Sequence, residues 1–493
     1  MFLTCSSIPF ACKIFKKNKN QKSTVEVPYS TTELPPKYKE KVDGDKSFLH
    51  PEIIEKSITQ SAIDSFSKHY NSNPKNELAQ TVIKQAKMET VLLNNDALIR
   101  NEREFEIKIK LEGNVTNQKQ SGRCWIFAST NTIRLGVMKR FHLKEFELSQ
   151  NFIFFYDKLE KANSFLQKAI DLADKNETSN AVQELFSDPM QDGGTWNTVA
   201  SLVEKYGICP KSAFPETYHS ENSTEMDWLL TNKIREYGVT LRRLIHAGEK
   251  SPEEILQVKA KMMNAMYRII VTCLGEPPKS FDWKFRCTKG HFHSFENLTP
   301  KSFYEEHIKK DVIDKVNLTH DPRHKFFKKK EEDGTIYGTK EYNVNVPIEV
   351  LKEAVIVQLK NNDPATFACD VHKFYGKNTM DMDLFNYEAA FDLTPTAMSR
   401  LDRVTYKESY ANHEMVFTGV HLDSDQKPLR WRVENSWGAV LETTGRHAGG
   451  NGAGGFEVMN DAWFNEYVFD VVIDKKYLSE GNLLKVANAI QQA

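Results

Sequence analysis

The residues best suited to covalent chemistry begin with Cys124, which follows a polar stretch and opens a largely apolar, helix-like run to Phe141. The first turn of a helix presents free backbone N–H groups and the positive end of the helix dipole. Both favour a negative charge, so we predict a lowered thiol pKa and a reactive thiolate at Cys124. Such a thiolate can attack the carbonyl carbon of an amide.

Two N–H donors are available for the oxyanion that this attack would create. Gln118 lies six residues before Cys124, and its side-chain amide can point into the same space. The backbone N–H of Cys124 is the second donor, and Gly122 lets the chain come close to a reacting carbonyl. We therefore predict an oxyanion hole formed by Gln118 and Cys124.

A nucleophilic thiolate also needs a partner that takes its proton and returns it to the leaving amine, a role that suits histidine. Among 14 histidines, His413 opens a strand-like run, and Asn435 lies on a second such run, 435 − 413 = 22 residues later. Antiparallel pairing of the two runs would place the Asn435 carbonyl oxygen beside the His413 ring and fix its tautomer. Trp437 could shield that hydrogen bond from water.

The elements that must hold these residues change character along the chain, with helical spacing first and strand-like runs last. We predict an α+β fold with large helical insertions. The predicted segments are a disordered tail and linker (1–46), an N-terminal helical segment (47–113), a helical lobe with the nucleophile (114–215), a helical insertion (216–345), a β-rich lobe with the histidine and asparagine (346–475) and a C-terminal tail (476–493).

Within the β-rich lobe, the strand predictions rest on β-branched and aromatic residues between polar turns. A helix opening at Pro347 is also expected, although the short run of residues 355–357 alone would fit a strand. The predicted strands cover residues 365–371, 415–422, 431–436 and 456–459.

Composition limits the class of protein. The 66 Lys and Arg residues nearly balance 67 Asp and Glu residues, so the whole chain has no drive toward nucleic acid or anionic membranes. Seven irregularly spaced cysteines without a Cys-x-x-Cys pair argue against a disulfide framework or a zinc site, and no metal or cofactor is expected. We expect a cytoplasmic protein, with an organelle-targeting segment in the lysine-rich residues 1–25 as the alternative.

The spacing of the candidate residues resembles that of a known family. A glutamine six residues before a Cys-Trp pair, a histidine at a strand start and an Asn-Ser-Trp-Gly run from Asn435 match the papain superfamily in order and context. The sequence around these residues is similar to that of the bleomycin hydrolase and aminopeptidase C family. The stretches that carry this likeness are residues 116–125, 147–150, 158–162, 192–194, 206–211 and 432–438.

The resemblance implies a two-lobe papain-like fold and a cysteine aminopeptidase that cleaves peptide and peptide-like amide bonds through a thioester. Cys124 would be the nucleophile, His413 the acid and base, Asn435 its orienting partner and Gln118 an oxyanion donor. Gly193, Gly194 and Trp437 would contact the substrate, although a Gly-Gly pair alone is more often a turn. The 413 − 124 = 289 residues between nucleophile and histidine, against roughly 130–150 in papain, fit insertions that mediate a homohexamer.

Two positions depart from the family pattern. Family members end in an arm that enters the cleft and meets the free amino group of the substrate, and residues 478–493 lack its Trp-Asp-Pro-Met-like stretch. The residue after the catalytic histidine is usually small, and here it is Glu414, which either perturbs His413 or faces solvent.

These departures keep other functions open. An endopeptidase is the alternative within the enzyme class, because the changed C-terminus weakens the restriction to free N-termini. A nucleic-acid-binding oligomer with secondary peptidase activity is the alternative outside it, although the net charge of −1 argues against strong general affinity. A catalytically idle scaffold is a third reading, which the intact Cys–His–Asn set disfavours.

Overall fold

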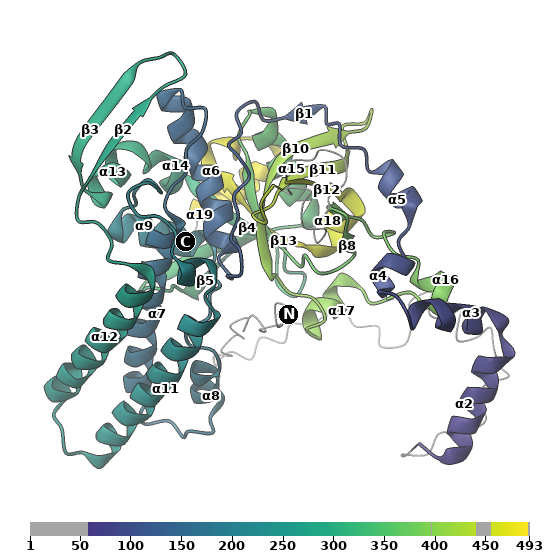
Figure 1. Cartoon of the computed structure of the whole chain (residues 1–493), viewed down its shortest axis with the longest axis horizontal. Coiled ribbons are helices and arrows are strands. Elements are labelled where there is room, and N and C mark those ends of the chain that lie inside the picture. The colour runs from purple at the N-terminus through teal and green to yellow at the C-terminus, as the bar shows by residue number, and fades with distance from the viewer. Residues whose placement is uncertain (1–57, 396, 440–454, 492–493) are drawn as a thin grey trace.

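A computed structural model describes residues 58–395, 397–439 and 455–491. The tail and linker predicted for residues 1–46, and the targeting segment considered for residues 1–25, lie outside these residues. The described chain forms a helical lobe beside a lobe built on one large sheet (Figure 1). Both secondary-structure types are therefore present in the order that the sequence predicted, helices first and most strands last.

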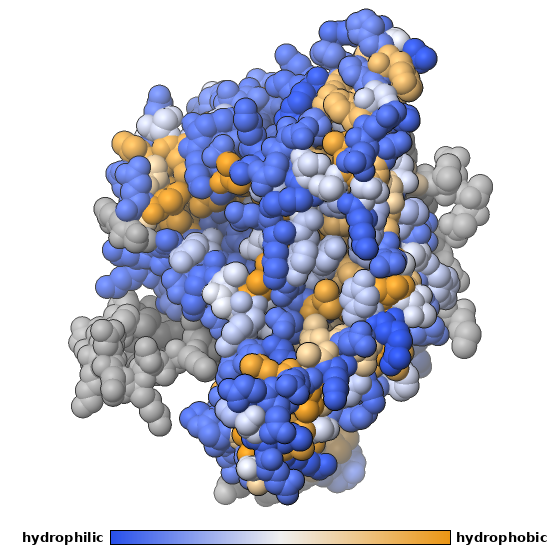
Figure 2. Space-filling model, turned by 90° about the vertical axis from the view of Figure 1, so that its left-hand side faces the viewer, coloured by the Kyte–Doolittle hydropathy of each residue, from blue (hydrophilic) through white to orange (hydrophobic). Residues whose placement is uncertain are grey.

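The helical lobe packs around one apolar core, to which α6, α7, α9, α11 and α12 all contribute. Side-chain caps start several of these helices; Ser149 caps α7, and Ser251 forms a capping box with Glu254 ahead of α12. On the face shown in Figure 2, apolar side chains lie among polar ones over this lobe. Its helices are α6 (Cys124–Phe141), α7 (Gln150–Asp171), α8 (Asn180–Ser187), α9 (Trp196–Tyr206), α10 (Tyr218–Glu221), α11 (Thr224–Ala247) and α12 (Pro252–Leu274).

The prediction that residues 216–345 are helical is wrong beyond Leu274. The chain there forms a hairpin, two short helices and three strands that extend the main sheet. The hairpin alternates apolar and polar residues, with Trp283 buried, which is the period of a strand and not of a helix. The elements are β2 (Phe281–Arg286), β3 (Phe292–Leu298), α13 (Pro300–His307), α14 (Lys310–Ile313), β4 (Lys315–Thr319), β5 (Lys328–Asp333) and β6 (Lys340–Asn345).

The second lobe is organised by an 11-stranded sheet in the order β5-β6-β4-β13-β7-β10-β11-β12-β9-β8, with β1 added to β10. All four predicted strands are present, and residues 355–357 belong to a helix, α15. The further elements are β1 (Ile107–Lys108), α15 (Ile348–Lys360), β7 (Ala365–Cys369), β8 (Tyr375–Gly376), β9 (Thr379–Met380), α17 (Arg400–Thr405), β10 (His413–Leu422), β11 (Pro428–Glu434), β12 (Phe456–Asn460), α18 (Asp461–Tyr467) and β13 (Val468–Asp474).

The C-terminal segment was expected to be a tail, but it forms a helix, α19 (Gly481–Gln491). Leu483, Val486 and Ala489 recur every three residues and are buried in the core of the sheet lobe. This apolar face packs α19 against α15 and the β5–β6 edge of the sheet. Burial of the face accounts for the helix, which is too short to be stable alone.

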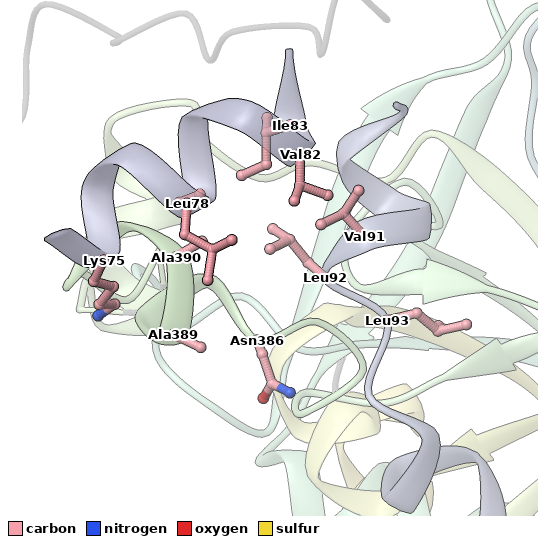
Figure 3. A pocket seen from close by; sticks show the side chains of 11 residues that line it. Lys75, Leu78, Val82, Ile83, Val91, Leu92, Leu93, Asn386, Ala389 and Ala390 are labelled. Carbon is pink, nitrogen blue, oxygen red and sulfur yellow. The ribbon is translucent and has the colours of Figure 1, made fainter. Parts of the chain in front are cut away.

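The N-terminal helices form a separate arm at the edge of the sheet lobe (Figure 1). They are joined to it through α16 (Tyr387–Phe391), with which they bury a small apolar cluster. A shallow pocket of about 290 Å³ lies between them and α16, lined by apolar side chains such as Leu78, Val82 and Leu92 (Figure 3). The helices are α2 (Gln60–Ser72), α3 (Pro74–Ile83), α4 (Met88–Val91) and α5 (Asn95–Arg100).

Helix α6 lies between the two lobes and is buried on almost its whole circumference. Polar side chains on its sheet-facing side bond to the sheet: Arg134 forms an ion pair with Glu434 at 3.1 Å, and Asn131 donates to the same carboxylate at 3.0 Å. The hydroxyls of Thr132 and Thr366 on β7 lie 3.0 Å apart. Burial raises the pKa of Glu434 to about 7, although Arg134 opposes this shift. Among the described residues, no helix is long and apolar enough to cross a membrane.

We predict that Arg134→Met lowers the free energy of unfolding by about 3 kcal/mol at pH 8, because it leaves a buried carboxylate without its cation. The loss should be smaller at pH 5. A buried carboxyl with a raised pKa can be protonated there, and its charge then no longer destabilises the folded state. Urea denaturation at the two pH values measures both effects. Lys139→Met, on the exposed side of the same helix, is the control, and equal losses in the two variants would contradict the prediction.

Candidate active site

Cys124 is the first residue of α6 and is 5% exposed. The residue before it, Arg123, provides no side-chain cap, so the first-turn N–H groups of the helix stay available. The backbone N–H groups of Trp125 and Glu414 lie close enough to the Cys124 sulfur to lower the pKa of its thiol. Because Glu414 directly follows His413 on β10, the sulfur lies near the strand start that carries the predicted histidine.

His413 and Asn435 are brought together by the pairing of β10 with β11. The strands run antiparallel, with Val416 opposite Glu434, as the sequence predicted. His413 Nε2 lies 2.9 Å from Asn435 Oδ1, which also accepts the backbone N–H of Ser436 at 2.8 Å. A backbone N–H can only donate, so this atom is the amide oxygen and the proton of the His413 ring is on Nε2. The Nδ1 atom is then left as a proton acceptor.

The protonation of the pair differs from the sequence prediction. Burial is the largest cause, and it raises the pKa of the Cys124 thiol to about 12 against the two N–H donors that lower it. Burial also lowers the pKa of His413 to about 4, although the bond to Asn435 opposes this. The predicted lowering of the thiol pKa is therefore wrong. Burial thus disfavours the charged form of each group taken alone.

Gln118 bridges the two lobes just before the nucleophile. Its Oε1 accepts the Ser436 hydroxyl at 2.6 Å, and its Nε2 donates to the Ser121 carbonyl at 2.7 Å. Its backbone N–H also donates to the Ser436 carbonyl at 2.8 Å. The Gln118 amide nitrogen has a second N–H that the bond to Ser121 does not use. The side chain is 6% exposed, so its orientation is fixed by these bonds.

Trp437 packs over the histidine. The ring centroids of Trp437 and His413 are 4.8 Å apart, and Tyr375 meets Trp437 edge to face at 5.6 Å. Trp437 is 36% exposed. It therefore covers the His413 ring on one side and presents its other atoms to solvent.

The Gly193–Gly194 pair lies on a loop that is tied to the start of α6. Asp192 accepts the backbone N–H of Gly122 at 2.8 Å, and the Gly193 carbonyl accepts Lys161 Nζ at 2.7 Å. A Cβ on Gly194 would lie 2.7 Å from the Trp125 ring, so only glycine fits there. Gly193 is buried, whereas Gly194 is half-buried at the surface beside the nucleophile helix.

The sequence did not identify the residues that hold Cys124, His413 and Asn435 or their loops in place. Glu457 Oε1 accepts Asn435 Nδ2 at 2.9 Å and the Tyr375 hydroxyl at 2.9 Å, and burial raises the pKa of Glu457 to about 7. Asp192 forms a buried ion pair with Lys158 at 2.8 Å. In the sequence, the one sign of the role of Glu457 was that it is a single acidic residue within the apolar strand of residues 456–460. The described residues contain no group of three or more His, Cys, Asp or Glu that could hold a metal.

Comparison with known proteins places this geometry in a family context. Residues 57–492 match the model of the Peptidase C1-like family. The chain is 37% identical to human bleomycin hydrolase (Homo sapiens) over 424 residues, which cover 83% of this chain and 91% of that protein. It is 36% identical to aminopeptidase C of Listeria monocytogenes over 434 residues, with coverage of 87% and 95%. The crystal structure of PepW from Lactobacillus rhamnosis superposes with a TM-score of 0.82 at 35% identity, with coverage of 89% and 96%. The mixed α+β papain-like fold is confirmed.

We predict that Glu457→Ala slows the alkylation of Cys124 by iodoacetamide at pH 7.5 by about threefold to tenfold, the value of one hydrogen bond. The alkylation rate should fall because the Asn435 amide no longer has the Glu457 acceptor that fixes its orientation. Glu457→Gln keeps an acceptor oxygen and should restore most of the rate, which a general packing defect would not allow. Glu102→Ala, at an exposed position, is the control. An unchanged rate in folded Glu457→Ala would contradict this role.

Proposed function

Because the chain belongs to the Peptidase C1-like family, within the cysteine aminopeptidases of the bleomycin hydrolase and aminopeptidase C group, we propose that it hydrolyses peptide and peptide-like amide bonds next to free N-termini. The observation that carries the proposal is the bond of His413 Nε2 to Asn435 at 2.9 Å, at the strand start whose next N–H meets the Cys124 sulfur. This arrangement leaves Nδ1 of the imidazole to take the thiol proton.

The reaction starts from two neutral groups. As the Cys124 sulfur attacks the substrate carbonyl carbon, its proton passes to His413 Nδ1, and Asn435 keeps the imidazolium oriented. The C–N bond then breaks and His413 returns the proton to the leaving amine, which leaves a thioester on Cys124. His413 next takes a proton from water, the resulting hydroxide attacks the thioester, and the acid and the thiol are released.

The developing oxyanion is stabilised by the backbone N–H of Cys124 and the unused N–H of Gln118. At such sites, one donor that is already oriented increases kcat by about 10²- to 10³-fold. Gln118 is held by Ser436 and Ser121 before substrate arrives, so no reorganisation is needed. Gly193, Gly194 and Trp437 form the adjacent substrate surface, and Gly194 is required there because a Cβ would meet the Trp125 ring.

The C-terminus bears on the choice between aminopeptidase and endopeptidase. The described end of the chain is α19, which is held against α15 by its buried apolar face. The Trp-Asp-Pro-Met-like stretch implied by the resemblance has no match in residues 478–493, which keeps the endopeptidase as the alternative. Substrates with free and blocked N-termini distinguish the two activities.

We predict that the wild type hydrolyses Ala-7-amido-4-methylcoumarin at least tenfold faster, in kcat/KM, than its N-acetyl derivative. Cys124→Ala should abolish both activities and leave thermal unfolding unchanged within a few degrees. Fluorescence assays at pH 7.5 measure the rates. Equal rates on the two substrates would favour the endopeptidase, and full activity of Cys124→Ala would remove Cys124 from the mechanism.

We further propose that the chain assembles as a homohexamer through its helical part. Trp228 and Leu229 are neighbours on α11 and are 68% and 41% exposed, and Leu256 on α12 is 52% exposed. Contiguous exposed apolar patches mark protein–protein contacts. Figure 2 shows the face over which these helices lie.

Native mass spectrometry at micromolar concentration should detect six chains for the wild type and smaller species for Trp228→Glu, because a charge in an apolar contact is costly. Arg243→Glu, on an exposed part of α11 far from Trp228, provides the control for added negative charge. A monomeric wild type would rule out the assembly.

A further inference from the structure

Glu414, the residue after His413, does not face solvent. It is 8% exposed, so that alternative from the sequence is wrong. Its backbone N–H points to the Cys124 sulfur, which places the residue directly at the nucleophile. The direction of its side chain follows from the strand register.

Three neighbouring strands align Glu414 with a second carboxylate. Glu414 on β10 lies opposite Ala368 on β7, and Ala368 lies opposite Asp470 on β13. Residues opposite one another on neighbouring strands project from the same face of a sheet. The methyl group of Ala368 is small, so the two longer acidic side chains can approach each other above it.

This row faces the helix that carries the nucleophile. Ala368 and Thr366 are two residues apart on β7 and therefore share a face. The Thr366 hydroxyl contacts Thr132 of α6 at 3.0 Å, which identifies that face as the one toward α6. Glu414 and Asp470 thus lie on the sheet surface against which the nucleophile helix packs, with Glu414 at the Cys124 end.

The two carboxylates have no cation in the described part of the chain: no Lys, Arg or His forms an ion pair with either. Glu414 Oε2 is buried and has no hydrogen-bond partner there. Burial first, and then the charge of Asp470, raises the pKa of Glu414 well above its usual range. Burial likewise raises the pKa of Asp470 to about 7, although the Ala368 N–H donates to its carboxylate.

A buried acidic oxygen without a partner is destabilising, and such groups persist mainly where a ligand completes them. Oε2 of Glu414 needs a donor, and a cation would favour the ionised form of both carboxyl groups. A group that supplies both is a primary ammonium or a guanidinium, which also forms strong charge-assisted bonds to carboxylates. The position beside Cys124 means that the cation would belong to the molecule being cleaved.

We propose that Glu414 and Asp470 form a subsite for a cationic group of the substrate close to the scissile carbonyl, with Glu414 in contact and Asp470 as the supporting charge. The inference rests on the proposed peptidase function and deepens it. Two sources supply this chemistry: the free α-ammonium of the N-terminal residue, and the side chain of a lysine or arginine. The first would provide a recognition of free N-termini that does not depend on a C-terminal arm.

Four coumarin substrates separate these sources. Free and N-acetylated alanyl amides differ in the α-ammonium and in the added acetyl group, and N-acetyl-arginyl and N-acetyl-citrullyl amides differ in the side-chain charge at nearly the same shape. Glu414→Gln should lower kcat/KM about 10- to 100-fold for whichever cationic substrate the wild type prefers, the value of a charge-assisted bond. The loss should exceed any change for the uncharged substrates about tenfold, because removing the charge of Glu414 also alters the pKa of Cys124 for every substrate. Asp425→Asn, in the exposed turn after β10, removes the same charge and serves as the control.

A second measurement does not require peptidase activity. The rates at which cationic 2-aminoethyl methanethiosulfonate and neutral methyl methanethiosulfonate modify Cys124 are compared, with the site located by mass spectrometry and each rate divided by that of a small thiol. The wild type should favour the cationic reagent, and Glu414→Gln should reduce this preference about tenfold.

The results distinguish failure of the subsite from failure of the function. Loss of cation preference toward the thiol reagent in Glu414→Gln, with no hydrolysis by the wild type, would support the subsite and refute the peptidase. Equal effects of Glu414→Gln on charged and uncharged substrates, or no effect on either substrates or reagents, would overturn the subsite. Thermal unfolding of Glu414→Gln and Asp470→Asn shows that such a result does not come from misfolding.

Discussion

The site depends on how the start of α6 is held against the start of β10. The sulfur belongs to a helix of the helical lobe, and the imidazole belongs to a strand of the sheet lobe. Each lobe has its own apolar core, so the two lobes must be held in a fixed position relative to each other. Hydrophobic packing supplies the affinity between lobes but little direction. Direction comes from buried polar contacts of α6, in which Arg134 and Asn131 both reach Glu434, the residue before Asn435. The same ion pair therefore orients the helix and the strand end that carries the amide.

Burial sets the proton balance at this junction. It disfavours the charged forms of the Cys124 thiol and the His413 imidazole, because each charge alone would be poorly solvated. Transfer of the proton between them creates both charges at once, and each then stabilises the other. The amide of Asn435, fixed by Glu457, prepares the imidazole for this transfer by holding the proton on Nε2. Glu414, whose buried Oε2 has no hydrogen-bond partner among the described residues, is a further acidic group at the same junction.

The sequence allowed the central residues to be predicted because their signals are local or stand in short motifs. Cys124 at a helix start, Gln118 six residues earlier and Asn435 at the end of a paired strand are all where the spacing indicated. The strand character of residues 365–369 and 413–422 followed from their composition in the same way. The cytoplasmic location remains a prediction.

What the sequence could not provide depends on tertiary contacts. The sign of the Cys124 pKa shift was wrong, because burial by the second lobe outweighs the helix start. Strand β4 pairs with β13, more than 100 residues further along the chain, and no local pattern identifies such a partner. The roles of Glu457 and Glu414 could not be predicted because they depend on strand register. That register sets Glu414 in line with Ala368 and Asp470.

The central claim is that the imidazole of His413 takes the proton of the Cys124 thiol across the lobe boundary. The pH dependence of Cys124 alkylation in the wild type and in His413→Ala tests it most directly. The account predicts that the wild type reacts readily at neutral pH, whereas His413→Ala reacts only as the solution approaches the raised thiol pKa of about 12. Superimposable pH profiles for the two proteins would contradict it.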